Sequence, residues 1–318
     1  MILLIELAAI LGFIVSVCLI KIFGLHYYFP DFTTFNFILK HYLGPLFFAL
    51  VIMVIVFFWQ SKRKQAAIQK LVKFMPLRLF IPFAVIIYLH FNFKLWAQIL
   101  NHFLFDDFYL SLDQKFQPLL DFFDFFYYFA GLNLVSNLNL YHSLFVFMFA
   151  FSFILASLNK DRTVIIKIVT ATALVLLIGG IAYSFAPAIG PFIYRDGLSN
   201  TDALFQQKML NSYQDFVASQ GQNYQKENFV NAIAAMPSLH IANALVFVYF
   251  AYYYFRHFFP VFLIIFIFLV IEALVLRWHY LIDIPAGVAV AMLSIFLANK
   301  YFILDFGKNA VQPKTIKD

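Results

Sequence analysis

Charged residues and cysteine are scarce in this chain. Charged side chains make up 12% of its 318 residues and hydrophobic ones 64%, against roughly 25% and 45–50% in an ordinary soluble domain. A water-soluble fold of this length could not bury so much apolar surface. With Cys18 as the single cysteine, an intramolecular disulfide is excluded. We therefore predict an integral membrane protein.

Internal repeats, linkers rich in glycine or serine, and a second soluble domain are also lacking. The formal net charge is +6, but the lysine and arginine residues fall in short clusters between apolar runs. Such clusters are typical of topology signals in membrane proteins, and the chain shows no basic stripe of a nucleic-acid-binding fold. Nucleic acid is therefore not expected as a partner.

Eight apolar runs approach the length of about 20 residues that a membrane span needs. They cover residues 2–23, 43–59, 77–96, 140–158, 163–186, 239–256, 260–276 and 284–302. The third run is the most interrupted, by Pro82, His90, Asn92 and Lys94. We predict an all-α polytopic membrane protein with about eight transmembrane helices.

Basic residues assign the connecting segments to the two sides of the membrane. Residues 61–78 carry the densest group of lysine and arginine, which marks them as cytoplasmic by the positive-inside rule, and residues 65–75 predict a short helix on that surface. Both termini then lie in the cytoplasm, and the segments 97–139, 187–239 and 277–283 lie on the opposite side. The first of these mixes acidic and aromatic residues, typical of a helix in the interface. Compact loops favour a bacterial plasma membrane.

One polar cluster, residues 277–287 with the sequence RWHYLIDIPAG, leads into the last predicted span. Ionisable residues beside membrane spans are costly, so such a cluster indicates a function. His279 and Asp283 are four residues apart, so one helical turn brings the imidazole and the carboxylate to the same side. The carboxylate can orient the ring through one nitrogen and leave the other free to attack. Pro285 suits the first turn of a helix, whose N-terminus attracts anions.

A second polar cluster, residues 234–240 with the sequence AAMPSLH, has the same layout. Pro237 and Ser238 stand where a helix begins, and His240 falls within its first turn. Two helix starts on one side of the membrane, each bearing a histidine, suit a bound anion. The two clusters together predict a phosphate site.

In these two clusters the chain resembles the type 2 phosphatidic acid phosphatase superfamily. The strings PSLH and HYLIDIPAG are similar to the second and third motifs of that family. The second string is most similar to the branch of inositolphosphotransferases and sphingolipid-headgroup synthases. The resemblance implies a six-helix core at residues 77–303, preceded by two additional N-terminal helices at 1–76 and followed by a tail at 304–318.

The resemblance also implies a role for each matching residue. His279 would be the nucleophile that forms a phosphohistidine, Asp283 would orient it, and His240 would protonate the leaving group and then activate the acceptor. Ser238 would help to hold the phosphate oxygens. The implied reaction needs no metal and no cofactor. Its substrate would be a lipid phosphate, and its acceptor would be water or an alcohol headgroup.

Two departures from the phosphatase branch favour headgroup transfer of the inositolphosphotransferase type over hydrolysis by water, which stays open. The usual first motif is missing, and Glu272 and Ala273 stand where that branch has a Ser-Arg pair. Residues 183–195 look like the Pro- and Gly-rich replacement in the transferase branch. Arg195 and Arg277 are therefore the candidates for neutralising phosphate charge.

Two alternatives without catalysis stay open. Eight spans with polar residues in the membrane also suit a lipid transporter or scramblase, although these motifs cluster at helix ends rather than at the midplane. An inactive family member that only binds lipid is disfavoured, because His240, His279 and Asp283 are all present.

Overall fold

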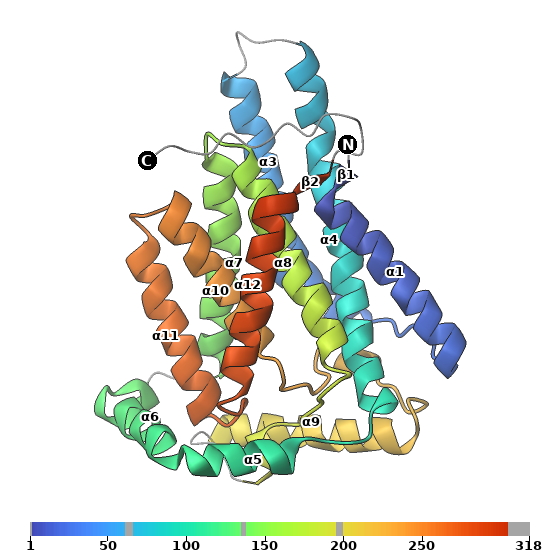
Figure 1. The fold of residues 1–318 in the computed structure, drawn as a ribbon, viewed down its shortest axis with the longest axis vertical. Helices are drawn as coiled ribbons and strands as arrows, with labels where there is room; N and C mark the ends of the chain where they lie inside the picture. The colour runs from blue at the N-terminus through green and yellow to red at the C-terminus, as the bar shows by residue number, and fades with distance from the viewer. Residues whose placement is uncertain (1, 61–65, 135–137, 195–199, 305–318) are drawn as a thin grey trace.

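A bundle of long helices forms the body of the protein (Figure 1). The computed structural model describes residues 2–60, 66–134, 138–194 and 200–304. The bundle consists of α1 (Leu4–Phe23), α3 (Gly44–Gln60), α4 (Ala66–Leu100), α7 (Leu138–Leu158), α8 (Thr163–Ala182), α10 (Leu239–Tyr254), α11 (Phe259–Val275) and α12 (Asp283–Tyr301). The predicted all-α polytopic architecture is confirmed.

The eight predicted spans all coincide with apolar helices. Six helical stretches are long and apolar enough to cross a membrane: Leu4–Phe23, Phe32–Val56, Met75–Leu100, Asn139–Leu158, Thr163–Ala182 and Asp283–Tyr301. The other two predicted spans correspond to α10 and α11, which are apolar but only 16 and 17 residues long. At about 1.5 Å per residue they reach roughly 25 Å, most of the thickness of a hydrocarbon layer of about 30 Å.

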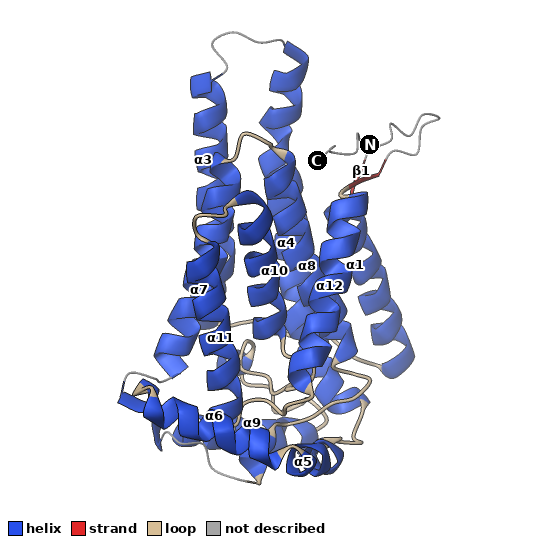
Figure 2. Cartoon of the chain, turned by 60° about the vertical axis from the view of Figure 1, so that its left-hand side comes forward, coloured by secondary structure: helices blue, strands red, loops and turns tan. Residues whose placement is uncertain are grey.

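Three helices lie across one end of the bundle (Figures 1 and 2). They are α5 (Asp106–Lys115), α6 (Gln117–Phe129) and α9 (Asn200–Ala218). The first two belong to the acidic segment that was expected to cover the bundle. Short helical turns connect this layer to its neighbours: η2 (Leu132–Leu134), η3 (Pro191–Ile193) and η4 (Lys226–Asn228).

The two ends of the described chain meet at the opposite end of the bundle (Figure 1). There β1 (Ile2–Leu3) pairs with β2 (Ile303–Leu304) as a short antiparallel sheet. The amide of Leu4 continues this pairing by donating to the carbonyl oxygen of Phe302, at 3.1 Å. The two ends of the described chain therefore lie on one side of the bundle, and α5, α6 and α9 lie on the other.

The N-terminal helices pack into the same bundle as the rest of the chain. α1 packs against α4 and α8, and α3 packs against α7. Before α3 come α2 (Phe32–Ile38) and the π-helical turn η1 (Leu39–Leu43). α4 is one helix of 35 residues that contains Pro76 and Pro82, so the separate surface helix expected at 65–75 is wrong for residues 66–75. Proline is tolerated in such helices because neighbouring groups can satisfy the carbonyl that it frees.

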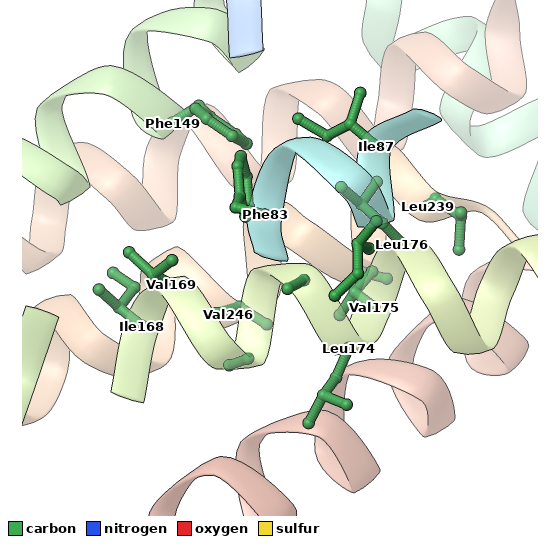
Figure 3. Packing of buried hydrophobic residues seen from close by; sticks show 14 of the residues in the cluster. Phe83, Ile87, Phe149, Ile168, Val169, Leu174, Val175, Leu176, Leu239 and Val246 are labelled. Carbon is green, nitrogen blue, oxygen red and sulfur yellow. The ribbon is translucent and has the colours of Figure 1, made fainter. Parts of the chain in front are cut away.

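α8 is the centre of the core, and α4, α10 and α12 pack around it. Most of its side chains are buried, and Figure 3 shows Val169, Val175 and Leu176 among the side chains of its neighbours. Gly179 near its end sets a close approach: a Cβ atom there would lie 2.2 Å from Leu239. Only glycine leaves room for Leu239, the residue directly before His240, to pack in this position.

Candidate active site

The turn before α12 holds His279 and Asp283 together. The ring nitrogen Nδ1 of His279 lies 3.1 Å from Oδ2 of Asp283, and the amide of Tyr280 donates to the same oxygen at 2.9 Å. Asp283 is fully buried. Because a carboxylate accepts hydrogen bonds, the proton of the neutral imidazole lies on Nδ1 and the lone pair lies on Nε2.

Ser238 connects the two motifs. Its hydroxyl lies 3.1 Å from Nε2 of His279, and its amide donates to the carbonyl oxygen of Asp283 at 3.2 Å. With the His279 lone pair on Nε2, the hydroxyl is the donor in the first bond. Gly287 permits this contact, since a Cβ atom there would lie 2.5 Å from the carbonyl oxygen of Ser238. The starts of α10 and α12 therefore touch through their backbones.

His240 lies in the first turn of α10, as predicted. Its ring packs edge-on against Phe145, with centroids 4.6 Å apart, and also contacts Tyr141 at 5.5 Å. None of the residues that the structure describes forms a hydrogen bond with the ring, so both of its nitrogens are available to a ligand. His240 and His279 both line one cavity.

The cavity has a volume of about 680 Å³, within the range of about 300–1,000 Å³ that is usual for small-molecule sites. Its walls join the two histidines to residues from the first hundred of the chain, among them Phe37, His41 and Lys94. Phe37 and His41 belong to α2 and η1, so part of the segment 1–76 that was expected as an addition to a six-helix core also lines the site.

Asp106 holds two loops of the site together. Its carboxylate accepts the amides of Ile189 and Gly190, at 3.0 and 2.9 Å, and the hydroxyl of Tyr280 at 2.8 Å. Asp106 is buried at the start of α5, and burial raises the pKa of its carboxyl while these hydrogen bonds oppose the rise. Through Asp106, the Pro- and Gly-rich loop after α8 is fixed to the residue next to His279.

A second carboxylate of α5 contacts the same turn. Asp113 accepts the amide of Leu281 at 3.0 Å and is buried. Burial raises the pKa of Asp113 to about 6, and the nearby Asp283 adds to the rise. The α5 helix therefore supports the turn between His279 and Asp283 at two points.

The two arginine candidates differ in what the structure describes. Arg277 forms an ion pair with Asp124 of α6 at 2.6 Å and donates to the carbonyl oxygen of Leu274 at 3.1 Å. It is buried and is not among the residues that line the cavity. Arg195 lies outside the described residues. Phosphate binding by Arg277, Arg195 or Ser238 stays a prediction.

Sequence reasoning missed several residues that build the site. Asp106, Asp113 and Asp124 were noticed only as the acidic character of a covering segment. A signal in the sequence could have identified them. Burying a carboxylate beside a membrane is costly, so each of these aspartates needs a hydrogen-bonding or ionic partner. Lys94 was noticed only as an interruption of an apolar run. A lysine inside a predicted span is itself a signal for a functional site.

These features define a polytopic membrane protein with two histidines and a carboxylate at helix starts around one cavity. A protein-family model described as the PAP2 superfamily matches residues 128–297, which is more than half of the chain and includes both motifs. The chain therefore belongs to the PAP2 superfamily, whose members are phosphatases and phosphotransferases. No curated protein and no solved structure matches the chain.

Proposed function

We propose that this protein transfers a phosphoryl group from a lipid phosphate through a covalent phosphohistidine at His279. The observation that carries the proposal is the hydrogen-bonded series Ser238–His279–Asp283, whose imidazole opens with His240 onto one cavity. A nucleophile, an orienting carboxylate and a second acid–base group around one space are the components that covalent catalysis needs.

In the first step, Nε2 of His279 attacks phosphorus, and the bond from phosphorus to the leaving oxygen breaks. Asp283 holds the proton on Nδ1 and stabilises the positive charge that develops on the ring. Protonated His240 gives its proton to the leaving oxygen. The new bond to phosphorus uses the lone pair of Nε2, which then no longer accepts the hydrogen bond from Ser238. The Ser238 hydroxyl donates to a phosphate oxygen instead.

In the second step, neutral His240 takes a proton from the acceptor, which attacks phosphorus and releases His279. His240 must therefore be protonated in one step and neutral in the other. A bell-shaped dependence of kcat on pH follows from this requirement.

The proposed acceptor is an alcohol headgroup of the inositol type, and water is the alternative. Two observations support transfer: the HYLIDIPAG string and a cavity of about 680 Å³, which has room for an alcohol beside the phosphate. The proposed site faces the non-cytoplasmic side, with both termini in the cytoplasm. A cysteine introduced at Lys208, exposed on α9, tests this, because an impermeant maleimide should label it on intact cells.

The experiment that tests the proposal is a lipid-phosphate assay with purified protein in the presence of EDTA. Phosphatidic acid and phosphatidylinositol are each offered with and without inositol as acceptor. Free phosphate from phosphatidic acid, or inositol phosphate from phosphatidylinositol without added inositol, would identify a hydrolase. Inositol phosphate formed from phosphatidic acid only when inositol is present would identify a transferase. His279→Ala should lose all turnover. Equal rates for His279→Ala and the wild-type protein would contradict the proposal, and lipid movement across vesicles without turnover would indicate a transporter or scramblase.

A further inference from the structure

We propose that Lys94 is the cation that binds the substrate's phosphate group, an inference that rests on the proposed function. Lys94 belongs to α4 and lines the same cavity as His240 and His279. It precedes residue 128, where the match to the PAP2 superfamily begins. The assignment therefore adds a residue from outside the family segment to the site.

Lys94 has no ionic partner in the described part of the chain. No carboxylate there forms an ion pair with it, and no described group forms a hydrogen bond with its ammonium. Its Nζ lies 5.9 Å from the centroid of the Tyr183 ring. A lysine this far inside a membrane helix is costly unless an opposite charge or a polar ligand compensates it.

The surroundings of Lys94 suit an anion. His90 lies one turn earlier on the same face of α4, and Asp202 is the one carboxylate among the described residues of the cavity wall. Lys94 is near enough to His240 for the two groups to interact electrostatically. Lys94 brings a positive charge to the cavity that the two histidines line, and a phosphate group bound there would neutralise it.

The position of Lys94 is fixed by the packing of its helix. His90 donates from Nδ1 to the carbonyl oxygen of Leu176 in α8 at 2.9 Å, and α4 and α8 pack along much of their length. Because Leu239, the first residue of α10, also packs on α8 at Gly179, α8 sets the position of Lys94 relative to His240. Arg277 forms an ion pair with Asp124 and does not line the cavity, whereas Lys94 does.

The test is a binding measurement that needs no turnover. The full-length protein carrying His279→Ala is purified in detergent, and binding of dioctanoyl phosphatidic acid and of dioctanoyl phosphatidylinositol is measured. Adding Lys94→Met, which keeps the side-chain length, should weaken the binding of both lipids about 10- to 100-fold, the range for a lost charge-assisted contact. Lys94→Arg should stay within about threefold of the parent, because it keeps the charge. A larger loss for one lipid would show whether a monoester or a diester is preferred.

Two controls make the result specific to charge at this position. Lys208→Met removes an exposed lysine of α9 on the same side of the bundle and should leave binding unchanged. Uncharged dioctanoylglycerol should bind equally to the parent and to Lys94→Met. Thermal unfolding midpoints verify that each variant is folded, and Lys94→Gln replaces Lys94→Met if the latter fails to fold.

Equal phosphatidic acid affinity in the parent and in Lys94→Met would overturn the inference, as would an absence of binding in the parent. In the wild-type background, Lys94→Met should raise KM at least as much as it lowers kcat. If the wild-type protein turns over lipid phosphates but Lys94→Met binds them as tightly as the parent, this inference fails and the proposed function stands. If binding depends on Lys94 but no lipid phosphate is turned over, the proposed function fails instead.

Discussion

The two walls of the cavity are built differently. On the wall formed by the motifs, His279 is bonded on both of its ring nitrogens, to Asp283 and to Ser238. On the α4 wall, the ammonium of Lys94 has no ion pair or hydrogen bond among the described residues, and its Nζ lies 5.9 Å from the centroid of the Tyr183 ring. In the proposed mechanism the nucleophile His279 is therefore oriented before any substrate arrives, whereas the positive charge of Lys94 is left for the substrate to neutralise. Groups that are already oriented in the folded protein do not have to be reoriented during the reaction, so this energetic cost does not add to the barrier.

The support behind the motif wall comes from outside the two motifs. Asp106 and Asp113 of α5 accept backbone amides of the neighbouring loops, and Arg277 is tied to α6. The helices across the end of the bundle thus support the turn that carries His279. The α4 wall, by comparison, is positioned by packing on α8.

The largest effect should come from breaking the orientation of His279. Asp283→Asn removes the negative charge that holds the Nδ1 proton, so we expect kcat to fall by about 100- to 10,000-fold while KM changes little. Steady-state kinetics on phosphatidic acid measure this. Asp121→Asn, which changes an exposed carboxylate of α6, is the control. A kcat within threefold of the wild-type value would show that orientation by Asp283 is dispensable.

A smaller effect should come from separating the two helix starts. In Gly287→Ala the added methyl group would lie 2.5 Å from the carbonyl oxygen of Ser238, so α10 and α12 must move apart. We expect a loss of about 1–3 kcal/mol in the free energy of unfolding and a loss of about tenfold or more in kcat/KM. Thermal unfolding and kinetics measure both.

Ala289→Val is the matched control for Gly287→Ala, since Ala289 lies on the same helix with its side chain exposed. Because the side chain at this position is exposed, this variant should behave like the wild-type protein. Full activity of Gly287→Ala at an unchanged melting temperature would contradict the view that the motif wall depends on this close approach.

The smallest effect should be the pH dependence of stability contributed by Asp113, one of the α5 carboxylates that support the turn carrying His279. The pKa of Asp113 is raised from 3.8 to about 6 in the folded protein, so between these values the folded state binds more protons than the unfolded state. Stability contributed by this group is therefore present at low pH and is lost as pH rises through the window. Asp113→Asn keeps an acceptor for Leu281 and removes the titration.

The melting temperature of Asp113→Asn relative to the wild-type protein should accordingly increase between pH 4 and pH 7. Thermal unfolding in detergent at several pH values measures the difference, and Asp121→Asn serves again as the control. A difference that stays constant or decreases over this range would be inconsistent with a raised pKa at Asp113.

The sequence predicts the helices and the two motifs well because their signals are local. Apolar runs locate the spans, and the four-residue spacing of His279 and Asp283 places both groups on one side of a turn. The contacts that complete the site are long-range. Asp106 bonds to Gly190, 84 positions away, and no local pattern predicts that pairing. The partner of Arg277 is equally remote in sequence, since Asp124 is 153 positions away.

Other parts of the site depend on how the helices pack. Lys94 interrupts an apolar run in the sequence, but its position near His240 follows only from the packing of α4 on α8. The length of α4 was underestimated, because the predicted span covers residues 77–96 whereas the helix runs from Ala66 to Leu100 through Pro76 and Pro82. In a membrane bundle the neighbouring helices can accommodate such prolines.

The central claim is that His279 carries the phosphoryl group, and trapping the intermediate tests it most directly. Purified protein is mixed with ³²P-labelled phosphatidic acid and quenched within a single turnover, and the denatured chain is examined for bound label. We predict label that is stable to base, labile to acid, located on His279 and missing from His279→Ala. Label that persists in His279→Ala, or turnover by the wild-type protein with no labelled chain at any time, would contradict the account.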